Sequence, residues 1–178
     1  MAKTRGSGIA LGERAPSFEL PDTEGQTHSL EDAPATAVVF TCNHCPYALA
    51  WQDRIESVAR DYGERGVRVF AINSNDAERY PRDSYDAMQK RVREEDWPLP
   101  YLRDETQEVA AAYGAMTTPD VFVLDGEGRL RYRGAPDADY SDPGQNAEWL
   151  REALDDVLAG REPARPETEP VGCSIKWK

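Results

Sequence analysis

Two cysteines stand three positions apart in the stretch VVFTCNHCPYALAW, residues 38–51. A thiol pair with this spacing can form a redox-active disulfide, supply half of a metal site, or be buried and inert. Cys42 ends an apolar run typical of a buried strand, and a helical pattern follows Cys45. This order favours redox chemistry, because unpaired amides at a helix N-terminus stabilise a thiolate.

The order of the two cysteines predicts different roles for them. We expect Cys42 to be the nucleophile, with its pKa lowered from about 8.5 toward or below neutrality by the helix N-terminus. Cys45, one helical turn later, is expected to resolve mixed disulfides formed at Cys42. His44 either adds a charge or an N–H donor that tunes the Cys42 sulfur, or lies on a solvated turn and contributes little.

The stretch MTTPDVFVL places a Thr-Pro step, Thr118-Pro119, immediately before a predicted buried strand. Thioredoxin-like folds keep a cis proline at such a step, opposite their cysteine pair, and the pairing with CxxC predicts a cis bond here. Thr118 would then offer its N–H and C=O to an extended partner, so we expect Thr118 and Pro119 to bind substrate.

The order of strand, CNHC helix, strand, TTP, hairpin and terminal helix resembles a thioredoxin-fold protein. The opening LGERAPSFELPDTEGQTHSLED is similar to the redoxin branch, the AhpC/TSA and TlpA-like proteins. Within that branch, TCNHCPY and the closing GCSIKW resemble cytoplasmic thioredoxin-like proteins. The resemblance implies an α/β domain with a central mixed sheet flanked by helices, and a thiol-disulfide oxidoreductase that needs no organic cofactor.

Two departures from related families limit what the resemblance implies. Thioredoxin has Trp before its first cysteine and Gly-Pro between the pair, whereas this chain has Thr41 and Asn43-His44. Peroxiredoxins carry Pro and Thr seven and three residues before the peroxidatic cysteine, and Ala35 and Val39 stand there relative to Cys42. The missing Pro and Thr argue against a thiol peroxidase with antioxidant activity, which stays as an alternative beside a non-catalytic adaptor that binds peptides.

The pattern of apolar residues predicts the elements that position these motifs. Strands 36–41 and 67–74 enclose a helix with apolar residues at alternating spacings of three and four, forming a βαβ unit. Further along we expect helices at 82–94, at 105–114 and before Gly160, and a hairpin made by the strands 121–124 and 129–133.

The length and composition of the chain limit the classes of protein and partner that it fits. The chain has 178 residues, enough for one domain, which we place at 1–160 with a Pro- and charge-rich tail at 161–178. Its net charge of −12 repels phosphate backbones, so nucleic acid is an unexpected partner. We expect no membrane span and no secretory signal, and therefore a cytoplasmic protein that exchanges with protein or low-molecular-weight thiols and disulfides. The oligomeric state stays open.

The tail ends in VGCSIKWK, whose apolar residues alternate with a period of two. This pattern favours an extended clasp docked on the domain rather than a frayed end. Cys173 lies on this clasp and is either a third redox thiol or a small buried hydrophobe. A metal site needs about four ligands, which Cys42, Cys45, Cys173 and either His44 or His28 could supply. We nevertheless expect no metal site, because His44 projects differently from its flanking cysteines and the sequence has no second CxxC.

Overall fold

The computed structural model describes residues 8–178. Residues 1–7 lie outside the described residues. The start of the predicted domain, residues 1–160, falls there, as does the start of the N-terminal segment in which we expect no secretory signal. Within residues 8–178, no helix combines the length and the apolar character needed to cross a membrane.

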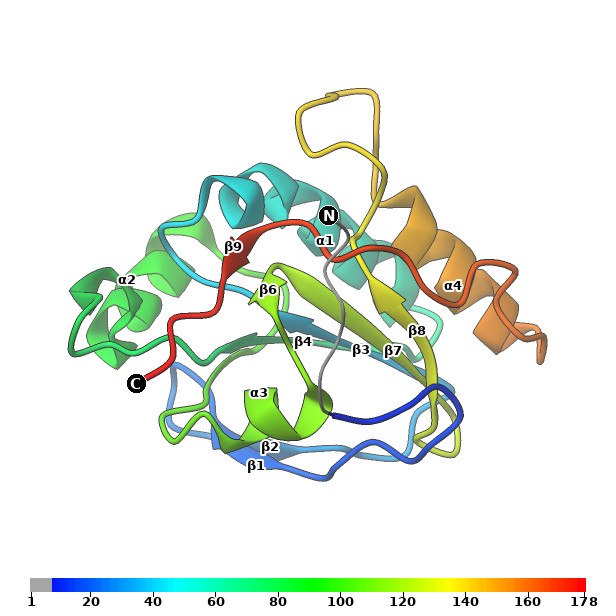
Figure 1. Cartoon of the computed structure of the whole chain (residues 1–178), viewed down its shortest axis with the longest axis horizontal. Coiled ribbons are helices and arrows are strands. Elements are labelled where there is room, and N and C mark those ends of the chain that lie inside the picture. Colours follow the sequence, from blue (N-terminus) through cyan, green and yellow to red (C-terminus); the bar gives the residue numbers. More distant parts are fainter. Residues whose placement is uncertain (1–7) are drawn as a thin grey trace.

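Five strands form a mixed sheet in the order β5-β4-β3-β7-β8 (Figure 1). Their bounds are β3 (Ala35–Phe40), β4 (Arg68–Asn73), β5 (Tyr101–Arg103), β7 (Asp120–Asp125) and β8 (Leu130–Gly134). β3 is parallel to β4 and antiparallel to β7, and β4 is parallel to β5. The predicted α/β fold with a central mixed sheet is confirmed.

The central strand β3 is buried on both faces, which explains its continuous apolar sequence. Ala37 and Val39 point into one hydrophobic core, while Val38 and Phe40 point into the other. This alternation follows from the two-residue period of a strand. The sheet therefore separates two cores.

Helices cover both faces of the sheet (Figure 1). The first core contains residues of α1 (Pro46–Gly63), α2 (Tyr85–Glu95) and α4 (Glu148–Leu158). The second core contains Ala110 and Tyr113 of α3 (Glu108–Tyr113). The predicted βαβ unit with a right-handed crossover runs from β3 through α1 to β4, so the CxxC between β3 and α1 lies at one end of the sheet.

The helix predicted at 82–94 begins later than its sequence pattern indicates. Pro81–Asp83 form a separate 3-10 turn, η1, and α2 starts after Ser84. The Ser84 hydroxyl accepts a hydrogen bond from the Ala87 amide at 3.1 Å, which caps the helix. This break turns Asp83 inward instead of leaving it on a polar helix surface.

Two smaller sheets complete the fold. One is the hairpin of β1 (Glu19–Pro21) and β2 (Thr27–Ser29). The other pairs β6 (Thr117–Thr118) with β9 (Cys173–Ser174), so the end of the chain lies beside the step before β7 (Figure 1). The connector at 161–170 approaches along β8, where the Thr168 amide donates to the Arg133 carbonyl at 3.0 Å.

Candidate active site

The two cysteines of the CxxC lie between β3 and α1. Thr41 extends β3 by donating its amide to the Ile72 carbonyl at 2.8 Å, and Cys45 is the N-cap residue of α1. Cys42 is 1% exposed and Cys45 is fully buried. All three cysteines of the chain are thiols in this structure.

Thr118 meets both cysteines although it lies more than seventy residues away in the chain. The Thr118–Pro119 peptide bond is cis. The Thr118 hydroxyl lies 3.3 Å from the Cys42 sulfur, and a protonated Cys45 donates to the Thr118 carbonyl at 3.2 Å. The structure thus brings the CxxC pair, Cys42 and Cys45, together with Thr118, which the sequence singled out in a separate motif.

The pKa of Cys42 is raised, whereas we predicted that the start of the helix would lower it. A hydrogen bond between the two thiols, followed by burial, raises the pKa of Cys42. The same hydrogen bond, together with donors from Cys173 and the Ala48 amide, lowers the pKa of Cys45 to about 4. The helix start adds a smaller effect: α1 begins at Pro46, so the Ala48 amide in its first turn favours the thiolate of Cys45, while the His44 amide favours that of Cys42.

A buried carboxylate, Asp83, lies beside the pair and was not predicted from the sequence. It is fully buried, and its charge also contributes to the raised pKa of Cys42. Its oxygens accept hydrogen bonds from the Asn43 amide at 2.7 Å and from the side chains of Asn73 and Asn75 at 3.1 and 3.0 Å. No sequence motif marks Asp83, because only the η1 turn directs it inward.

His44 faces this carboxylate rather than a solvated turn. Its Nδ1 lies 2.7 Å from an Asp83 oxygen, a close charge contact when the imidazole is protonated, although the hydrogen on Nδ1 is not directed at that oxygen. The ring stacks on Tyr80 with centroids 5.7 Å apart. His44 therefore lies close to both the Asp83 carboxylate and the Cys42 sulfur.

The loop between the cysteines is held by polar contacts from α2 and β5. The Arg91 guanidinium donates to the Cys42 carbonyl at 3.1 Å and to the Asn43 side-chain oxygen at 3.0 Å. The Tyr101 hydroxyl donates to the same Asn43 oxygen at 2.7 Å. These contacts fix the loop conformation, so Asn43 orients the backbone near the thiols.

One group of side chains in residues 8–178 has the composition of a metal site. Cys42, His44 and Asp83 each offer a ligand atom, and these atoms lie within 4.8 Å of one another. Three protein ligands of these types match a catalytic zinc site with an open position. The carboxylate of Asp83 already accepts three N–H donors and, with about four acceptor positions, has room for one further partner.

Cys173 lies on β9, directly opposite Thr118 in the β6–β9 ladder. Its thiol and its backbone both hydrogen-bond to Cys45, and they contribute to the lowered pKa of Cys45. Cys42, Cys45 and Cys173 pack together with Ala48 in one small cluster. The three thiols thus gather at one place.

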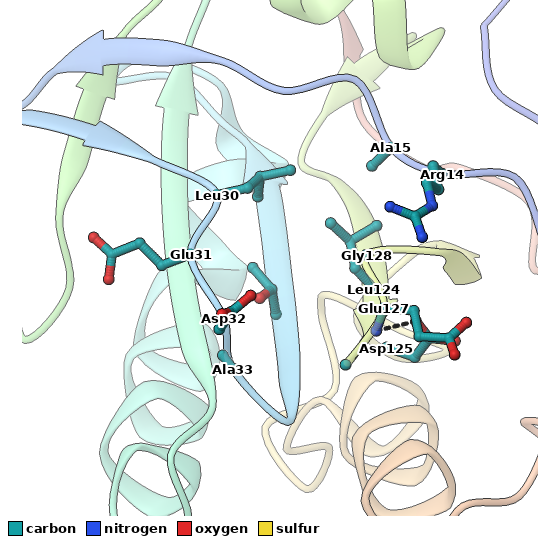
Figure 2. Close-up of a pocket in the computed structure, with 12 residues that line it drawn as sticks. Arg14, Ala15, Leu30, Glu31, Asp32, Ala33, Leu124, Asp125, Glu127 and Gly128 are labelled. Atoms are coloured by element: carbon teal, nitrogen blue, oxygen red, sulfur yellow. Dashed lines mark hydrogen bonds between the residues drawn. The ribbon is translucent and has the colours of Figure 1, made fainter.

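The hollow drawn in Figure 2 belongs to a different part of the molecule. Its volume is about 200 Å³, and it lies between the turn Asp125–Gly128, residues 30–33 and Arg14 (Figure 2). Thr36, near the start of β3, lines it, whereas Cys42 follows the other end of that strand. Within the turn that lines it, the Glu127 amide donates to the Asp125 side chain at 2.9 Å (Figure 2). This hollow therefore takes no part in the thiol chemistry.

Comparisons with known proteins agree with this architecture. A solved conserved protein from Geobacillus kaustophilus superposes with a TM-score of 0.89 at 44% identity, covering 95% of this chain and 93% of that one. The lipoprotein thioredoxin Etrx1 of Streptococcus pneumoniae superposes with a TM-score of 0.64 at 20% identity, over 79% of this chain and 98% of that one, which identifies a thioredoxin fold.

Sequence relatives extend the comparison. The thiol-disulfide oxidoreductase ResA of Geobacillus thermodenitrificans is 25% identical over 133 residues, which cover 72% of this chain and 71% of ResA. The model of the AhpC/TSA family matches residues 11–133, more than half of the chain. With the CxxC, the Thr-Pro step and the mixed sheet in place, the chain belongs to the AhpC/TSA family.

Proposed function

We propose that this protein is a thiol-disulfide oxidoreductase in which Cys42 and Cys45 form the exchanging pair. The observation that carries the proposal is the contact of both sulfurs with Thr118, at 3.3 and 3.2 Å, at the N-terminal end of α1. ResA and related sequences bear the name of thiol-disulfide oxidoreductase, which supports the same reaction class for this chain.

The first step needs a thiolate at Cys42. In the reduced protein the Cys42 S–H hydrogen-bonds to the Cys45 sulfur, and this hydrogen bond is the main cause of the opposite pKa shifts of the two thiols. Transfer of the proton along that hydrogen bond leaves the charge on Cys42. Because the pKa shifts favour the proton on Cys42, the form with its charge on Cys42 is the minor one, and it is the form that attacks.

The exchange then proceeds in two displacements. The Cys42 thiolate attacks one sulfur of a partner disulfide, forming a mixed disulfide, and the other partner sulfur leaves and takes up a proton. Cys45 loses its proton and attacks the Cys42 sulfur, forming the Cys42–Cys45 disulfide and releasing the second partner thiol. Two electrons pass from the protein to the partner, and the reverse sequence oxidises a partner dithiol.

The neighbouring residues have supporting roles in this proposal. Thr118 and Pro119 bind the partner backbone, and the Thr118 hydroxyl stabilises charge at the Cys42 sulfur. His44 tunes the same sulfur by balancing the negative charge of Asp83. The partners are protein or low-molecular-weight thiols and disulfides of the cytoplasm, and the electrons pass through cysteines without an organic cofactor.

Redox titration against dithiothreitol buffers tests the proposal, with alkylation and peptide mapping to report each cysteine separately. We expect Cys42 and Cys45 to convert together in one two-electron step in the wild type and in the Cys173→Ser variant. If both remain reduced throughout the accessible range, the protein is not a dithiol oxidoreductase. An adaptor would keep its function in Cys42→Ser, and a thiol peroxidase would form the disulfide rapidly with one equivalent of peroxide.

A further inference from the structure

The edge that a peptide partner would use is occupied by the chain's own C-terminal segment, residues 171–178. β9 pairs antiparallel with β6, with Ser174 opposite Thr117 and Cys173 opposite Thr118. The Ile175 amide continues the ladder by donating to the Met116 carbonyl at 3.1 Å. This is the strand-addition geometry by which extended peptides bind to a sheet edge.

Specific contacts hold the C-terminal segment in place. The Ile175 side chain is 3% exposed and lies in the core on the α3 side of the sheet. The Lys176 amide donates to the Asn75 side chain at 2.9 Å, and the Lys176 carbonyl accepts from the Asp76 amide at 2.8 Å and from Gln107 at 2.9 Å. The segment is therefore docked by both apolar and polar contacts.

Gly172 permits the close approach of the C-terminal segment to the Thr118 backbone. A Cβ at position 172 would lie 2.2 Å from the Thr118 carbonyl oxygen, far inside van der Waals contact. Only glycine fits there while β9 remains paired. Position 172 thus determines whether the segment can sit against Thr118.

This docking brings a third sulfur to the exchanging pair. Residues directly opposite each other in an antiparallel ladder place their side chains on the same face. Cys173 is opposite Thr118, whose hydroxyl contacts Cys42, and the Cys173 thiol hydrogen-bonds to Cys45. Cys173 therefore approaches the pair from the direction of a partner cysteine, and it contacts Cys45.

We propose that residues 171–178 act as a built-in peptide partner and that Cys173 is a third exchange thiol that reacts with the sulfur of Cys45. The proposal rests on the function proposed above, because it needs the Cys42–Cys45 disulfide as its starting point. It also names the class of protein partner: an extended peptide that carries a cysteine and displaces β9 from Thr117–Thr118.

The exchange balances without an external oxidant. Cys173 loses its proton and attacks the Cys45 sulfur of the Cys42–Cys45 disulfide, so the Cys45–Cys173 bond forms and the Cys42–Cys45 bond breaks. The electron pair leaves on Cys42, which becomes a thiolate and can take up the proton that Cys173 released. The number of disulfides is unchanged, and Cys42 regains the nucleophile needed for a partner.

The first experiment uses Cys42→Ser, which leaves Cys45 and Cys173 as the only thiols. In the dithiothreitol buffers that oxidise the wild-type pair, we expect an intramolecular Cys45–Cys173 disulfide in peptide maps of the monomer. Cys45→Ser is the matched control and should form at least about tenfold less Cys42–Cys173 disulfide, because Cys173 contacts Cys45.

The outcomes separate this inference from the proposed function. If the wild type forms Cys42–Cys45 while Cys42→Ser stays a dithiol or forms only intermolecular disulfides, Cys173 is not an exchange thiol and the proposed function stands. If the wild type forms no Cys42–Cys45 disulfide, the proposed function itself fails. Equal yields in Cys42→Ser and Cys45→Ser would also overturn the assignment of Cys45 as the sulfur that reacts.

A second experiment tests whether the C-terminal segment occupies the partner edge. Gly172→Ala should force β9 from Thr118 and raise the alkylation rate of Cys42 and Cys45 by at least about tenfold. A tenfold increase corresponds to a loss of about 1.4 kcal/mol in the free energy that favours the docked segment over the undocked one. Gly63→Ala, where an added Cβ meets no atom within 4 Å, is the control and should leave the rate unchanged. An unchanged alkylation rate in Gly172→Ala would overturn the proposal that residues 171–178 act as a built-in peptide partner.

Discussion

At the scale of single residues, the position of Cys45 decides where the negative charge rests. As the N-cap of α1, Cys45 receives a hydrogen bond from Cys42 and further ones from Cys173 and the Ala48 amide. Cys42 has fewer donors and faces the carboxylate of Asp83. The reduced pair therefore holds one thiolate at neutral pH, and the proton it retains lies on Cys42.

The first prediction concerns the pH range of this thiolate. Because the pKa of Cys45 is lowered to about 4, the thiolate should persist as the pH falls from 7 to 5 and disappear near pH 4. The ultraviolet absorbance of the thiolate, measured during acid titration of the reduced protein, checks this. The step should be missing in Cys45→Ser. A step centred near the ordinary thiol pKa of about 8.5 would contradict the prediction.

The second prediction concerns Asp83. Replacing Asp83 by Asn removes a negative charge that faces Cys42, so the Cys42 thiolate becomes easier to form and the reduced protein is favoured. We expect the midpoint potential of the pair to rise by about 10–30 mV in dithiothreitol buffers. Asp86→Asn, on the exposed surface of α2, is the matched control. A fall in potential would show that the charge of Asp83 does not act on the reduced pair.

The sequence predicted the cysteines of the site but not its buried carboxylate, Asp83. Cys42, Cys45 and Thr118 were recognised because their chemistry is tied to local patterns, a CxxC before a helix and a Thr-Pro step before a strand. Asp83 has no such pattern. Its inward position depends on the η1 turn and on amide donors from Asn73 and Asn75, which come from the end of another strand.

At the scale of elements, the buried strands could be predicted because their apolar residues are continuous or alternate with a period of two. The start of α2 could not, because Ser84 competes with the helical pattern by capping a shorter helix. The start of α1 mattered more for function. Because the helix begins after Cys45, the Ala48 amide of its first turn contributes to the lowered pKa of Cys45 rather than to that of Cys42.

The third prediction concerns the contact that holds α1 in place. Arg54 donates to the buried Asp137 at 2.8 and 3.0 Å and also to the Tyr140 and Asp142 carbonyls. Removing one partner of a buried ion pair leaves an uncompensated charge. We therefore expect Arg54→Met to lower the free energy of unfolding by about 3 kcal/mol in denaturant titrations.

Arg60→Met is the control for this prediction, because Arg60 is 58% exposed and lies 3.6 Å from its partner Glu56. The Glu56 side chain is 8% exposed, but the Arg60 guanidinium stays in solvent, so we expect this pair to contribute about 1 kcal/mol or less. Equal losses in Arg54→Met and Arg60→Met would mean that the contact with Asp137 does not anchor α1.

At the scale of the whole molecule, the two ends of the described chain meet in the same core. Ile9 and Ile175 both belong to the core on the α3 side, next to Phe40 and Phe122 of the central sheet. The C-terminal segment adds only a two-residue strand to this core. Most of the apolar burial and all five strands of the main sheet belong to residues before it. We therefore expect the segment to leave without unfolding the sheet.

The last prediction follows from this division between a stable sheet and a docked segment. Ile175→Ala removes the buried side chain of the segment, and a core substitution of this type costs about 2–4 kcal/mol when the whole fold depends on it. Because the segment opens locally, the loss should appear as faster hydrogen exchange at the Ile175 and Lys176 amides and faster alkylation of Cys42. The free energy of global unfolding should fall by less than about 1 kcal/mol.

Val171→Ala, at a position 37% exposed in the same segment, is the control and should change neither the local exchange nor the global stability. A full loss of global stability without local exchange would make residues 171–178 an integral part of the fold, and a peptide partner could then not displace them.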